Sequence, residues 1–374
     1  MPVSFIISLI PLLLFSGNIS LPSEFHSAST CGDKKPVKIG LLISNRSYNE
    51  SVDAARLALD QANIRGGYKG RQFELVVRTT EGPWGAGSKE SVALVYEDSV
   101  VAMLIALDGR NAHLAEQVAA KSHILCLSTC ATEPTLTQAY VPWFMRCIPN
   151  DNQQAEAIIE IIIRNGGGRI VILSSADYDA QYAVRSLIRK AAGAGIRSPV
   201  VVAIDSKKSD VQNLVRKLID LRPVHLVIPS GIPHASEVVK TLKQRFPDLQ
   251  MYGTLGFTGV ICPGGCPQWN NYEEMVLVTP GCRFTRSGQI FREQFSDTYG
   301  TPPGKLAAYA FDATNLVIEA ICQTGPDREY IKDYLREIKY RPGVAGSISF
   351  DEMGNRTGPV RLMKISNSIP VLIE

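Results

Sequence analysis

The hydrophobic positions in the first part of the chain alternate between two spacings. Residues 37–43 form a short run of β-branched and aliphatic side chains, and apolar residues then recur at intervals of three and four from Val52 to Ala62. The first pattern is typical of a buried strand and the second of one face of a helix. The alternation continues with strands predicted at 73–77, 101–107 and 124–127 and helices predicted at 88–97 and 112–121. Strands and helices in this order predict a parallel sheet with helices on both faces.

The same alternation begins again after residue 151. Apolar residues at helical spacing between Ala155 and Ile162 lead to three glycines, at 166–168, that end the helix. Beyond them we expect strands at 169–173, 200–204, 225–228, 251–254 and 275–279 and helices at 183–192, 211–221 and 235–246. Helices at 288–299, 305–322 and 328–338 and strands at 347–350, 360–365 and 370–373 complete the chain. The pattern predicts an α/β fold of two Rossmann-like units with parallel sheets.

The N-terminal residues differ from the rest of the chain. An apolar run at 3–15 is followed by small and polar residues as far as residue 30. The run is shorter than the roughly 20 residues that a membrane-spanning helix needs, so we predict a secretory leader at 1–30. The alternatives are a buried strand or helix and, at Cys31, a lipid anchor, although residues 28–30 match a lipobox poorly. The mature protein is expected outside the cytoplasm, either periplasmic or secreted.

Composition and charge narrow the class of protein. The chain has 374 residues, of which 45% are hydrophobic and 20% charged, as in a soluble protein of two or three domains. Lys and Arg together number 39 and Asp and Glu 36, which gives a net charge of +3. Proteins that bind nucleic acids usually carry a clear basic excess, so we expect no nucleic-acid partner.

The sequence lacks the common catalytic motifs. The glycines at 166–168 precede a predicted strand, whereas a phosphate-binding loop follows a strand and precedes a helix. No Walker loop, Gly-x-Ser-x-Gly elbow or His-Glu-x-x-His helix occurs, and no constellation forms around the five histidines. We therefore expect no enzyme activity and no cofactor.

The eight cysteines do not suggest a metal site. Cys262 and Cys266 lie in a turn-rich loop without a second Cys or His pair at zinc-site spacing. Because export permits disulfides, we expect a local disulfide there, or a bridge from one of the two to Cys282. Four further cysteines, in apolar surroundings, are predicted to be buried small hydrophobic residues: Cys126, Cys130, Cys147 and Cys322.

Four segments of the chain resemble a known family. Residues 124–137, which include Cys130-Ala131-Thr132, are similar to the strand and ligand loop of type I periplasmic binding proteins of the leucine/isoleucine/valine-binding type. Residues 145–149 resemble the hinge entry of that family, 309–313 its Tyr-Asp-Ala helix, and 346–355 its closing strand and turn. The resemblance extends from about Lys38 to the C-terminus. The same module occurs in receptor ectodomains and in cytoplasmic amide sensors.

The resemblance implies two lobes with parallel sheets, joined by a three-strand hinge. One lobe comprises 36–148 and 283–345, and the other comprises 149–282 and 346–374. Open α/β sheets bind ligands at the carboxyl ends of their strands, so a small molecule is expected in the cleft, which a hinge motion closes. The family delivers its ligand to an ABC permease in the membrane. The alternatives are a binding module that signals to a membrane sensor, and an enzyme on an α/β scaffold; we expect a monomer or a weak dimer.

The loop after the strand at 101–107 matches the first ligand loop of the family. Gly109 stands near the position of a serine that, together with N–H groups at a helix start, holds the ligand carboxylate in amino-acid binders. Arg110 offers a charged, bidentate partner for an anionic group. The alternative is a local ion pair between Asp108 and Arg110.

Cys130-Ala131-Thr132 matches the second ligand loop of the family, where a threonine hydroxyl and backbone groups hold the ligand. Thr132 is the leading single candidate, and its alternative role is to cap the segment that begins at Pro134. Tyr178 matches the aromatic residue of the other lobe that closes over the ligand, and Tyr48 offers the same from the first lobe.

One departure from the family concerns the ligand. Amino-acid binders use a carboxylate of the second lobe for the ligand ammonium, and Leu255 stands at the matching position here. With Phe257 two residues later, this favours an apolar or aromatic acid, an amide or another small metabolite over an α-amino acid. Leucine and valine are therefore expected to bind weakly. Trp84 is a further candidate for the wall of the cleft.

Overall fold

The computed structural model describes residues 35–83, 85–204, 211–261 and 269–373. The predicted leader at 1–30, Cys31, Trp84, Cys262 and Cys266 lie outside the described residues. Within these ranges, none of the helices is both long and apolar enough to cross a membrane.

The first sheet has five parallel strands in the order β2-β1-β3-β4-β5. They are β1 (Val37–Ile43), β2 (Phe73–Thr79), β3 (Ala102–Ala106), β4 (Leu125–Ser128) and β5 (Phe144–Arg146). Five helices accompany it: α1 (Asn49–Ile64), α2 (Ala86–Tyr96), α3 (Gly109–Ser122), α10 (Lys305–Thr324) and α11 (Arg328–Glu337). Leu41 and Leu42 belong to different hydrophobic clusters, so both faces of the sheet are buried. Burial on both faces explains why these strands read as continuous apolar runs. We call this sheet and its helices lobe one.

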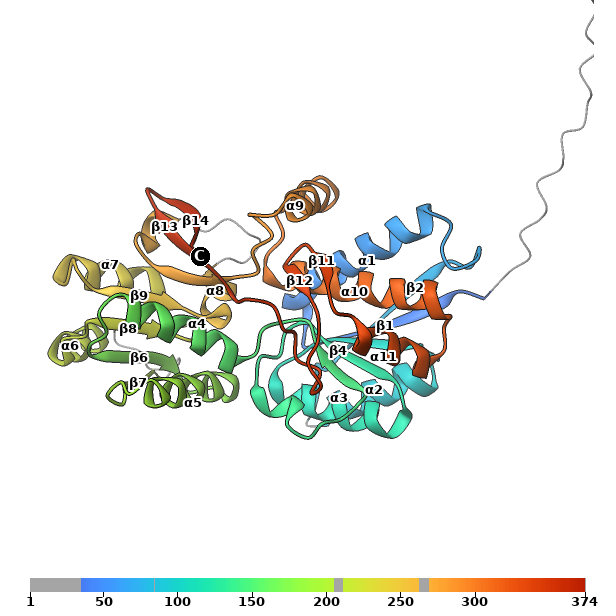
Figure 1. The fold of residues 1–374 in the computed structure, drawn as a ribbon, viewed down its shortest axis with the longest axis horizontal. Helices are drawn as coiled ribbons and strands as arrows, with labels where there is room; N and C mark the ends of the chain where they lie inside the picture. Colours follow the sequence, from blue (N-terminus) through green and yellow to red (C-terminus); the bar gives the residue numbers. More distant parts are fainter. Residues whose placement is uncertain (1–34, 84, 205–210, 262–268, 374) are drawn as a thin grey trace, which may run out of the picture. The chain divides into compact units, whose positions relative to one another are not determined.

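The second sheet has seven strands in the order β14-β13-β10-β9-β8-β6-β7 (Figure 1). The parallel strands are β6 (Ile170–Ser175), β7 (Val200–Ile204), β8 (His225–Ile228), β9 (Gln250–Gly253) and β10 (Val276–Thr279). The antiparallel strands β13 (Arg361–Ser366) and β14 (Ile369–Ile373) extend one edge. The accompanying helices are α4 (Asp151–Arg164), α5 (Tyr178–Gly193), α6 (Val211–Leu221), α7 (Ala235–Arg245) and α8 (Leu255–Ile261). We call this sheet and its helices lobe two. The predicted α/β class with two parallel sheets is confirmed.

Three connections join the two lobes. The first runs from β5 to α4, the second from β10 to α9 (Arg286–Tyr299), which packs on α1, and the third precedes β13. β12 (Gly346–Ile348) does not join the lobe-two sheet, because it pairs with β11 (Arg341–Gly343) in a separate two-stranded sheet. Beyond it, Asn355 forms a parallel bridge with Arg146. The residue boundaries that the sequence suggested for the lobes stay a prediction.

A buried arginine ties the first and third connections together. The guanidinium of Arg356 donates to the carbonyl of Cys147 at 2.8 Å and to the carbonyls of Ala345 and Ser347 at 2.8 and 2.9 Å. Asp312 of α10 accepts from the N–H groups of Val344 and Ala345 beside it. Only 4% of Arg356 is exposed, and hydrogen bonds of buried charged groups are stronger than those of neutral groups. These contacts fix the backbone of the hinge.

Most predicted strands and helices are present, with ends that differ by a few residues. Both α3 and α5 begin earlier than the apolar spacing indicated, at Gly109 and Tyr178. The reason is an aspartate at each start, Asp108 and Asp177, whose side chain caps the helix. The strand predicted at 347–350 is shorter, and β5, α8 and β11 were not predicted, because each is too short to show a hydrophobic period.

The described cysteines are all free thiols. Cys126, Cys147 and Cys282 are buried, as the apolar surroundings of Cys126 and Cys147 predicted, whereas Cys130, also predicted to be buried, is half-buried. The prediction for Cys322 was wrong, because this residue lies in the last turn of α10, where the helix leaves the core. Within the same ranges, no group of three or more His, Cys, Asp or Glu residues is placed to hold a metal ion.

Candidate functional site

The N-termini of α3 and α5 approach each other between the lobes. Each helix follows the carboxyl end of a parallel strand, β3 in lobe one and β6 in lobe two. Asp108 accepts from the N–H of Asn111 at 3.0 Å, and Asp177 accepts from the N–H of Ala180 at 2.8 Å. Carboxyl ends of parallel strands are where open α/β sheets bind ligands. The topology therefore brings the starts of α3 and α5, with the carboxylates of Asp108 and Asp177, to the edge of the sheets where a ligand is expected.

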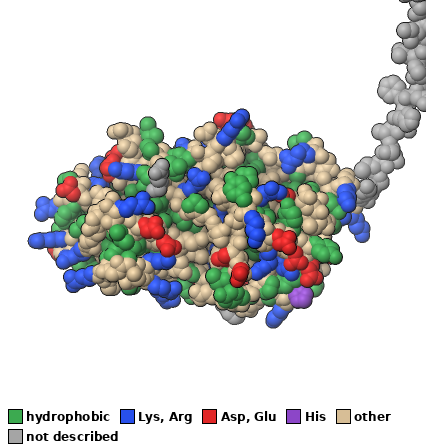
Figure 2. All heavy atoms as spheres, viewed as in Figure 1, with side chains coloured by type: hydrophobic (Ala, Val, Ile, Leu, Met, Phe, Trp, Pro, Cys, Tyr) green, Lys and Arg blue, Asp and Glu red, His purple; other side chains and the backbone are tan. Residues whose placement is uncertain are grey.

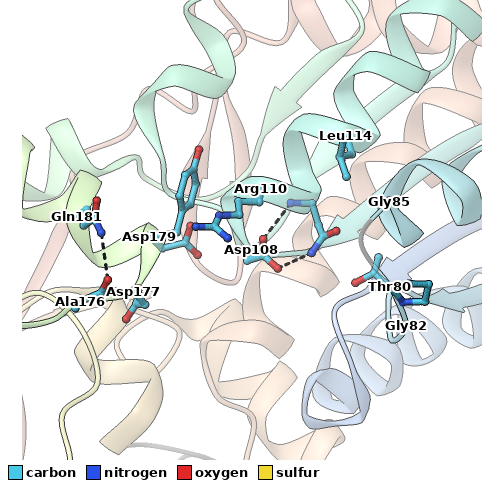
Figure 3. A pocket seen from close by; sticks show the side chains of 13 residues that line it. Thr80, Gly82, Gly85, Asp108, Arg110, Leu114, Ala176, Asp177, Asp179 and Gln181 are labelled. Carbon is cyan, nitrogen blue, oxygen red and sulfur yellow. Dashed lines mark hydrogen bonds between the residues drawn. The ribbon is translucent and has the colours of Figure 1, made fainter. Parts of the chain in front are cut away.

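A cavity of about 680 Å³ lies beside these helix starts (Figure 3). Side chains and backbone of both lobes line it: Thr80, Gly82, Pro83, Gly85, Asp108, Arg110, Asn111 and Leu114 from lobe one, and Ala176, Asp177, Tyr178, Asp179 and Gln181 from lobe two. The charged members are three aspartates and one arginine. The volume is within the range of about 300–1,000 Å³ that is usual for small-molecule sites.

The two lobes touch at the edge of the cavity. The N–H of Gly109 donates to the Oδ1 atom of Asp179 at 3.0 Å, and the guanidinium of Arg110 lies 4.6 Å from the centre of the Tyr178 ring. The hydroxyl of Tyr178 donates to the Oε1 atom of Glu133 at 3.3 Å. Residues 109 and 133 belong to lobe one and residues 178 and 179 to lobe two, so each contact crosses the cleft.

Position 109 leaves little room for a side chain. A Cβ atom there would overlap with Glu133 Oε2, and it would lie 2.7 Å from Asp179 Oδ1 and 3.2 Å from the Tyr178 ring. The space that a serine side chain would fill is thus taken by two carboxylates and an aromatic ring. The match of Gly109 to the serine of amino-acid binders stays a prediction.

Glu133 is part of a buried chain of hydrogen bonds. His113 links Glu116 and Glu133 through its two ring nitrogens, at 3.1 and 3.0 Å. These bonds raise the pKa of His113 to about 9, so the imidazole is protonated at neutral pH. Burial acts to raise the pKa of Glu133, but the bonds from His113 and Thr135 outweigh it and leave this pKa below its usual value. The Oε2 atom of Glu133 has no hydrogen-bond partner among the described residues.

Asp179 is the second carboxylate at this contact. Burial raises its pKa to about 6, against the lowering effect of the Gly109 N–H. Asp108, Asp177 and Glu133 contribute to the same rise of this pKa, because each is a nearby like charge. The region around Gly109 is therefore dominated by negative charge.

The structure brings part of the predicted site together. Asp108, Arg110 and Tyr178 line the cavity, and Gly109 contacts lobe two beside it. The alternative of an ion pair between Asp108 and Arg110 is wrong for the described chain, because Asp108 caps α3 and Arg110 lies over Tyr178. In Figure 3 the Arg110 side chain points towards Asp179.

The second predicted ligand loop lies next to this contact and does not line the cavity. Ala131 is buried, and its carbonyl accepts from Arg146 at 3.3 Å. Cys130 is half-buried and interacts with the hydroxyl of Tyr48. The side chain and the carbonyl of Thr132 both bond to Asp151, the first residue of α4. The residue that precedes the short helix Pro134–Thr137 is Glu133, so Thr132 does not cap it.

Leu255 and Phe257 lie in the interior of the protein. Neither has any exposed surface, and the ring of Phe257 packs edge-on against Tyr272. The Leu255 backbone accepts from Lys305 of lobe one at 2.9 Å. These residues form the first turn of α8, which directs its apolar side chains into the core. The structure thus places neither side chain in the cavity.

The sequence reasoning missed three acidic residues at the site: Glu133, Asp177 and Asp179. Lobe two does place carboxylates at the cavity, because Asp177 and Asp179 both line it, although Leu255 does not. The aspartate Asp177, directly after a predicted strand, is a helix-capping signal from which they could have been predicted. The expectation that leucine and valine bind weakly stays a prediction.

Residues 36–368 match a family model described as periplasmic binding protein. Among solved structures, the branched-chain amino acid transporter substrate-binding protein LivJ from Streptococcus pneumoniae, in complex with isoleucine, superposes with a TM-score of 0.75 at 20% identity, over 90% of this chain and 99% of that one. A solute-binding protein of an ABC transporter from R. palustris, in complex with benzoate, gives 0.76 at 16% identity, over 90% and 95%. At these identities the likeness shows the fold. The matching family and structures are those of solute-binding proteins and not of enzymes.

Curated sequences also include similar proteins. Glutamate receptor 3.7 from Arabidopsis thaliana is 28% identical over 163 residues, which are 41% of this chain and 18% of the receptor. Metabotropic glutamate receptor-like protein E from Dictyostelium discoideum is 24% identical over 255 residues, or 61% of this chain and 30% of that protein. The chain thus spans less than a third of the length of the curated relatives it matches.

Proposed function

Because the chain belongs to the periplasmic binding protein family, we propose that it captures a small solute between its lobes outside the cytoplasm and delivers it to an ABC importer. The observation that carries this proposal is the cavity at the carboxyl ends of both sheets, lined by charged groups from both lobes. A ligand that contacts both lobes stabilises their closed arrangement, and closure is the signal that a permease recognises in this family.

The lining of the cavity supports a polar solute. Arg110 suits an anionic group, since a guanidinium attracts negative charge and forms charge-assisted hydrogen bonds. Asp108, Asp177 and Asp179 suit a cationic group. We therefore propose a small charged or zwitterionic solute. Organic acids and amides remain in the set to be tested, and α-amino acids return to it.

A thermal-shift screen tests the binding function. Ligand that binds only the folded protein raises the melting temperature by mass action. For any solute that binds, we expect the shift to be lost in Arg110→Ala and Asp177→Asn and kept in Arg216→Ala, an exposed arginine on α6 away from the cavity. Equal shifts in all three variants would place the site elsewhere. A screen of a broad metabolite library without any shift would contradict the binding function itself.

The delivery step needs a separate test. Cells that lack this protein are expected to take up the identified solute more slowly, and uptake should return with the intact chain but not with Arg110→Ala. The second candidate function is ligand sensing without transport, and the likeness to plant and Dictyostelium receptors favours it. Unchanged uptake combined with loss of a transcriptional response to the solute would support sensing over transport.

The charge distribution gives no sign of a polymeric anion as partner. Figure 2 shows Lys and Arg interspersed with Asp and Glu on the face that it draws. Together with the net charge of +3, this agrees with a small molecule as the ligand.

A further inference from the structure

We propose that the outer edge of β7 in lobe two binds an acidic, extended segment of a partner protein, which adds to the sheet as a further strand. None of the β7 residues lines the cavity, so this surface is separate from the proposed solute site. Two features of the described chain support it: the edge of β7 is open, and exposed cations surround it.

The edge of β7 is uncharged and accessible. β7 ends the order of strands in the lobe-two sheet and pairs with β6 on one side, so its other side presents backbone N–H and C=O groups to a new strand. Val200 and Val201 are 40% and 41% exposed. Val202 and Ile204 pack inward, in the same hydrophobic cluster as side chains of α6. The edge thus combines free backbone groups with exposed aliphatic side chains.

The other outer strands of the two large sheets are protected against strand addition. β2 contains Glu74 and Arg78, and the Arg78 guanidinium is bound to three further acids. β5 is buried along its length, and Asn355 forms a bridge to it. β14 contains Pro370, which has no N–H for a neighbouring strand. Charge, cover and proline are the usual means of protection, and among these outer strands of the described chain β7 shows none of them.

The surroundings of β7 carry an excess of positive charge. Residues 180–204 and 211–222, which include most of α5 and all of β7 and α6, contain one acid, Asp220, and seven cations. The cations are Arg185, Arg189, Lys190, Arg197, Arg216, Lys217 and Arg222. All except Lys190 are exposed, and Lys190 is the one cation of this set with an ion pair within the described chain, to Glu156.

These cations lie on both sides of the sheet. Leu187 of α5 and Val215 of α6 belong to different hydrophobic clusters, so the two helices cover opposite faces. Figure 1 shows both helices next to β7, and Figure 2 shows several Lys and Arg side chains over this end of lobe two. A strand added to β7 would therefore lie between two rows of positive charge.

The charge selects the kind of partner. A second copy of this chain would bring the same seven cations against the first set, and like charges across an interface cost affinity. An acidic segment is attracted instead. In strand addition, main-chain hydrogen bonds give the affinity and alternate side chains give the specificity. We expect aliphatic side chains of the partner to meet Val200 and Val201 and its acidic side chains to reach the cations.

Synthetic peptides test this class of partner by fluorescence anisotropy. The first peptide is acetyl-EVEVTVEVE-amide, the second carries Lys in place of each Glu, and the third carries Pro in place of two Val and keeps the acids. We expect the first to bind at least about tenfold more tightly than either other, and to bind more weakly as NaCl rises from about 50 to about 300 mM. Equal affinities for the first and third would overturn strand addition, and equal affinities for the first and second would overturn the acidic preference. Absence of binding by the first peptide would overturn both.

Hydrogen exchange locates the binding. The first peptide should slow amide exchange at Val200–Ile204, because these groups gain hydrogen bonds to the added strand. Exchange at Ile369–Ile373, on the opposite edge of the sheet, is the internal control and should not change. Protection of the opposite edge without protection of β7 would contradict the assignment.

Charge reversal gives a further readout. Arg197→Glu combined with Arg216→Glu reverses two exposed cations, and Val201→Glu places an acid on the edge itself. We expect either change to lower the affinity for the first peptide about tenfold or more. Arg65→Glu combined with Lys121→Glu, at exposed positions of lobe one, is the matched control and should bind as the wild type does. An unchanged affinity in both lobe-two variants would refute the role of this edge.

Two other occupants give different results. Binding of the protein to phosphatidylglycerol vesicles, without binding of the first peptide, would assign the cations to a lipid surface and overturn the inference. A dimer in light scattering whose β7 amides are protected without any peptide would assign the edge to a second copy and overturn it as well.

Discussion

The hinge and the contact between α3 and α5 both place charged side chains in the interior, but the buried charged groups differ in how fully they are hydrogen-bonded. At the hinge, Arg356 gives its hydrogen bonds to three backbone carbonyls of the chain itself. At the contact, Glu133 keeps a buried oxygen without a partner, and a second carboxylate stands beside it. At the hinge, the hydrogen bonds of Arg356 come from the chain itself and hold the first and third connections between the lobes in place. The contact keeps an acceptor that the described chain does not satisfy, as is common at functional sites.

The largest effect is expected from breaking the hinge. Arg356→Met removes the three bonds to the carbonyls and leaves Asp312 without its neighbouring cation. We expect the free energy of unfolding to fall by about 3–4 kcal/mol, as for other buried charged groups that lose their partner. Urea denaturation measures it. Arg216→Met, at an exposed position, should change stability by less than about 0.5 kcal/mol. Similar losses in the two variants would contradict the role given to Arg356.

The next effect concerns the contact itself. Gly109→Ala inserts a methyl group where Glu133 and Asp179 meet, so the lobes cannot approach fully. Overpacking typically costs about 1–3 kcal/mol, so we expect the affinity for the ligand to fall about 10- to 100-fold. Gly193→Ala at the end of α5 meets no atom within 4 Å and is the control. Calorimetric titration of both variants decides the point; equal affinities would show that the close approach at Gly109 is irrelevant to binding.

A smaller effect is expected from pH. The folded state raises the pKa of His113 to about 9 through Glu116 and Glu133. The resulting stability is fully present below the ordinary histidine pKa of about 6.5 and is lost as the pH rises through about 9. The full shift corresponds to about 3 kcal/mol, and because 32% of the imidazole side chain is exposed and therefore screened by water, we expect an amplitude of about 1–2 kcal/mol. The free energy of unfolding, measured by denaturation at a series of pH values, should depend less on pH in His113→Gln than in the wild type. In His234→Gln, where the histidine is exposed, the pH dependence should be that of the wild type. An unchanged slope in His113→Gln would refute this account of the buried chain.

The smallest effect is expected at the aromatic ring. Tyr178→Phe keeps the ring beside Arg110 and removes the hydroxyl, which donates to Tyr182 of the same helix and to Glu133 of lobe one; only the bond to Glu133 joins the two lobes. A single hydrogen bond contributes about 0.5–1.5 kcal/mol net, so affinity should fall about three- to tenfold. Tyr330→Phe, at an exposed position, should bind as the wild type does. A larger loss than from Gly109→Ala would mean that Tyr178, and not the backbone contact, dominates closure.

The fold was largely predictable from the sequence because its signals are local. Strands such as β1 and β3 are buried on both faces and read as apolar runs, and helices such as α10 show a clear period. The short α8 gave no such signal, and its first residues were therefore read as a ligand loop. The resemblance correctly indicated the periplasmic binding protein family, whose matching structures are those of solute-binding proteins and not of enzymes.

The site was only partly predictable because it depends on the approach of two lobes. Asp108, Arg110 and Tyr178 follow strands at the expected edge and match ligand loops of the family, so the resemblance identified them as candidates, and all three line the cavity. Glu133 and Asp179 form part of the site only because both carboxylates lie against Gly109. They are 46 positions apart in the sequence and belong to different lobes. No spacing rule connects such residues, since the distance between them is set by the hinge.

The passage of the chain between the lobes has a consequence for recombination. The lobe-two sheet takes β6 to β10 from one stretch and β13 and β14 from another, with α9 to α11 and β12 between them. A single crossover between two related genes cannot exchange one lobe intact; it leaves a sheet with strands of mixed parentage. Chimaeras that transfer a lobe with its ligand preference therefore need junctions at all three connections, and the carbonyls that Arg356 binds mark two of them.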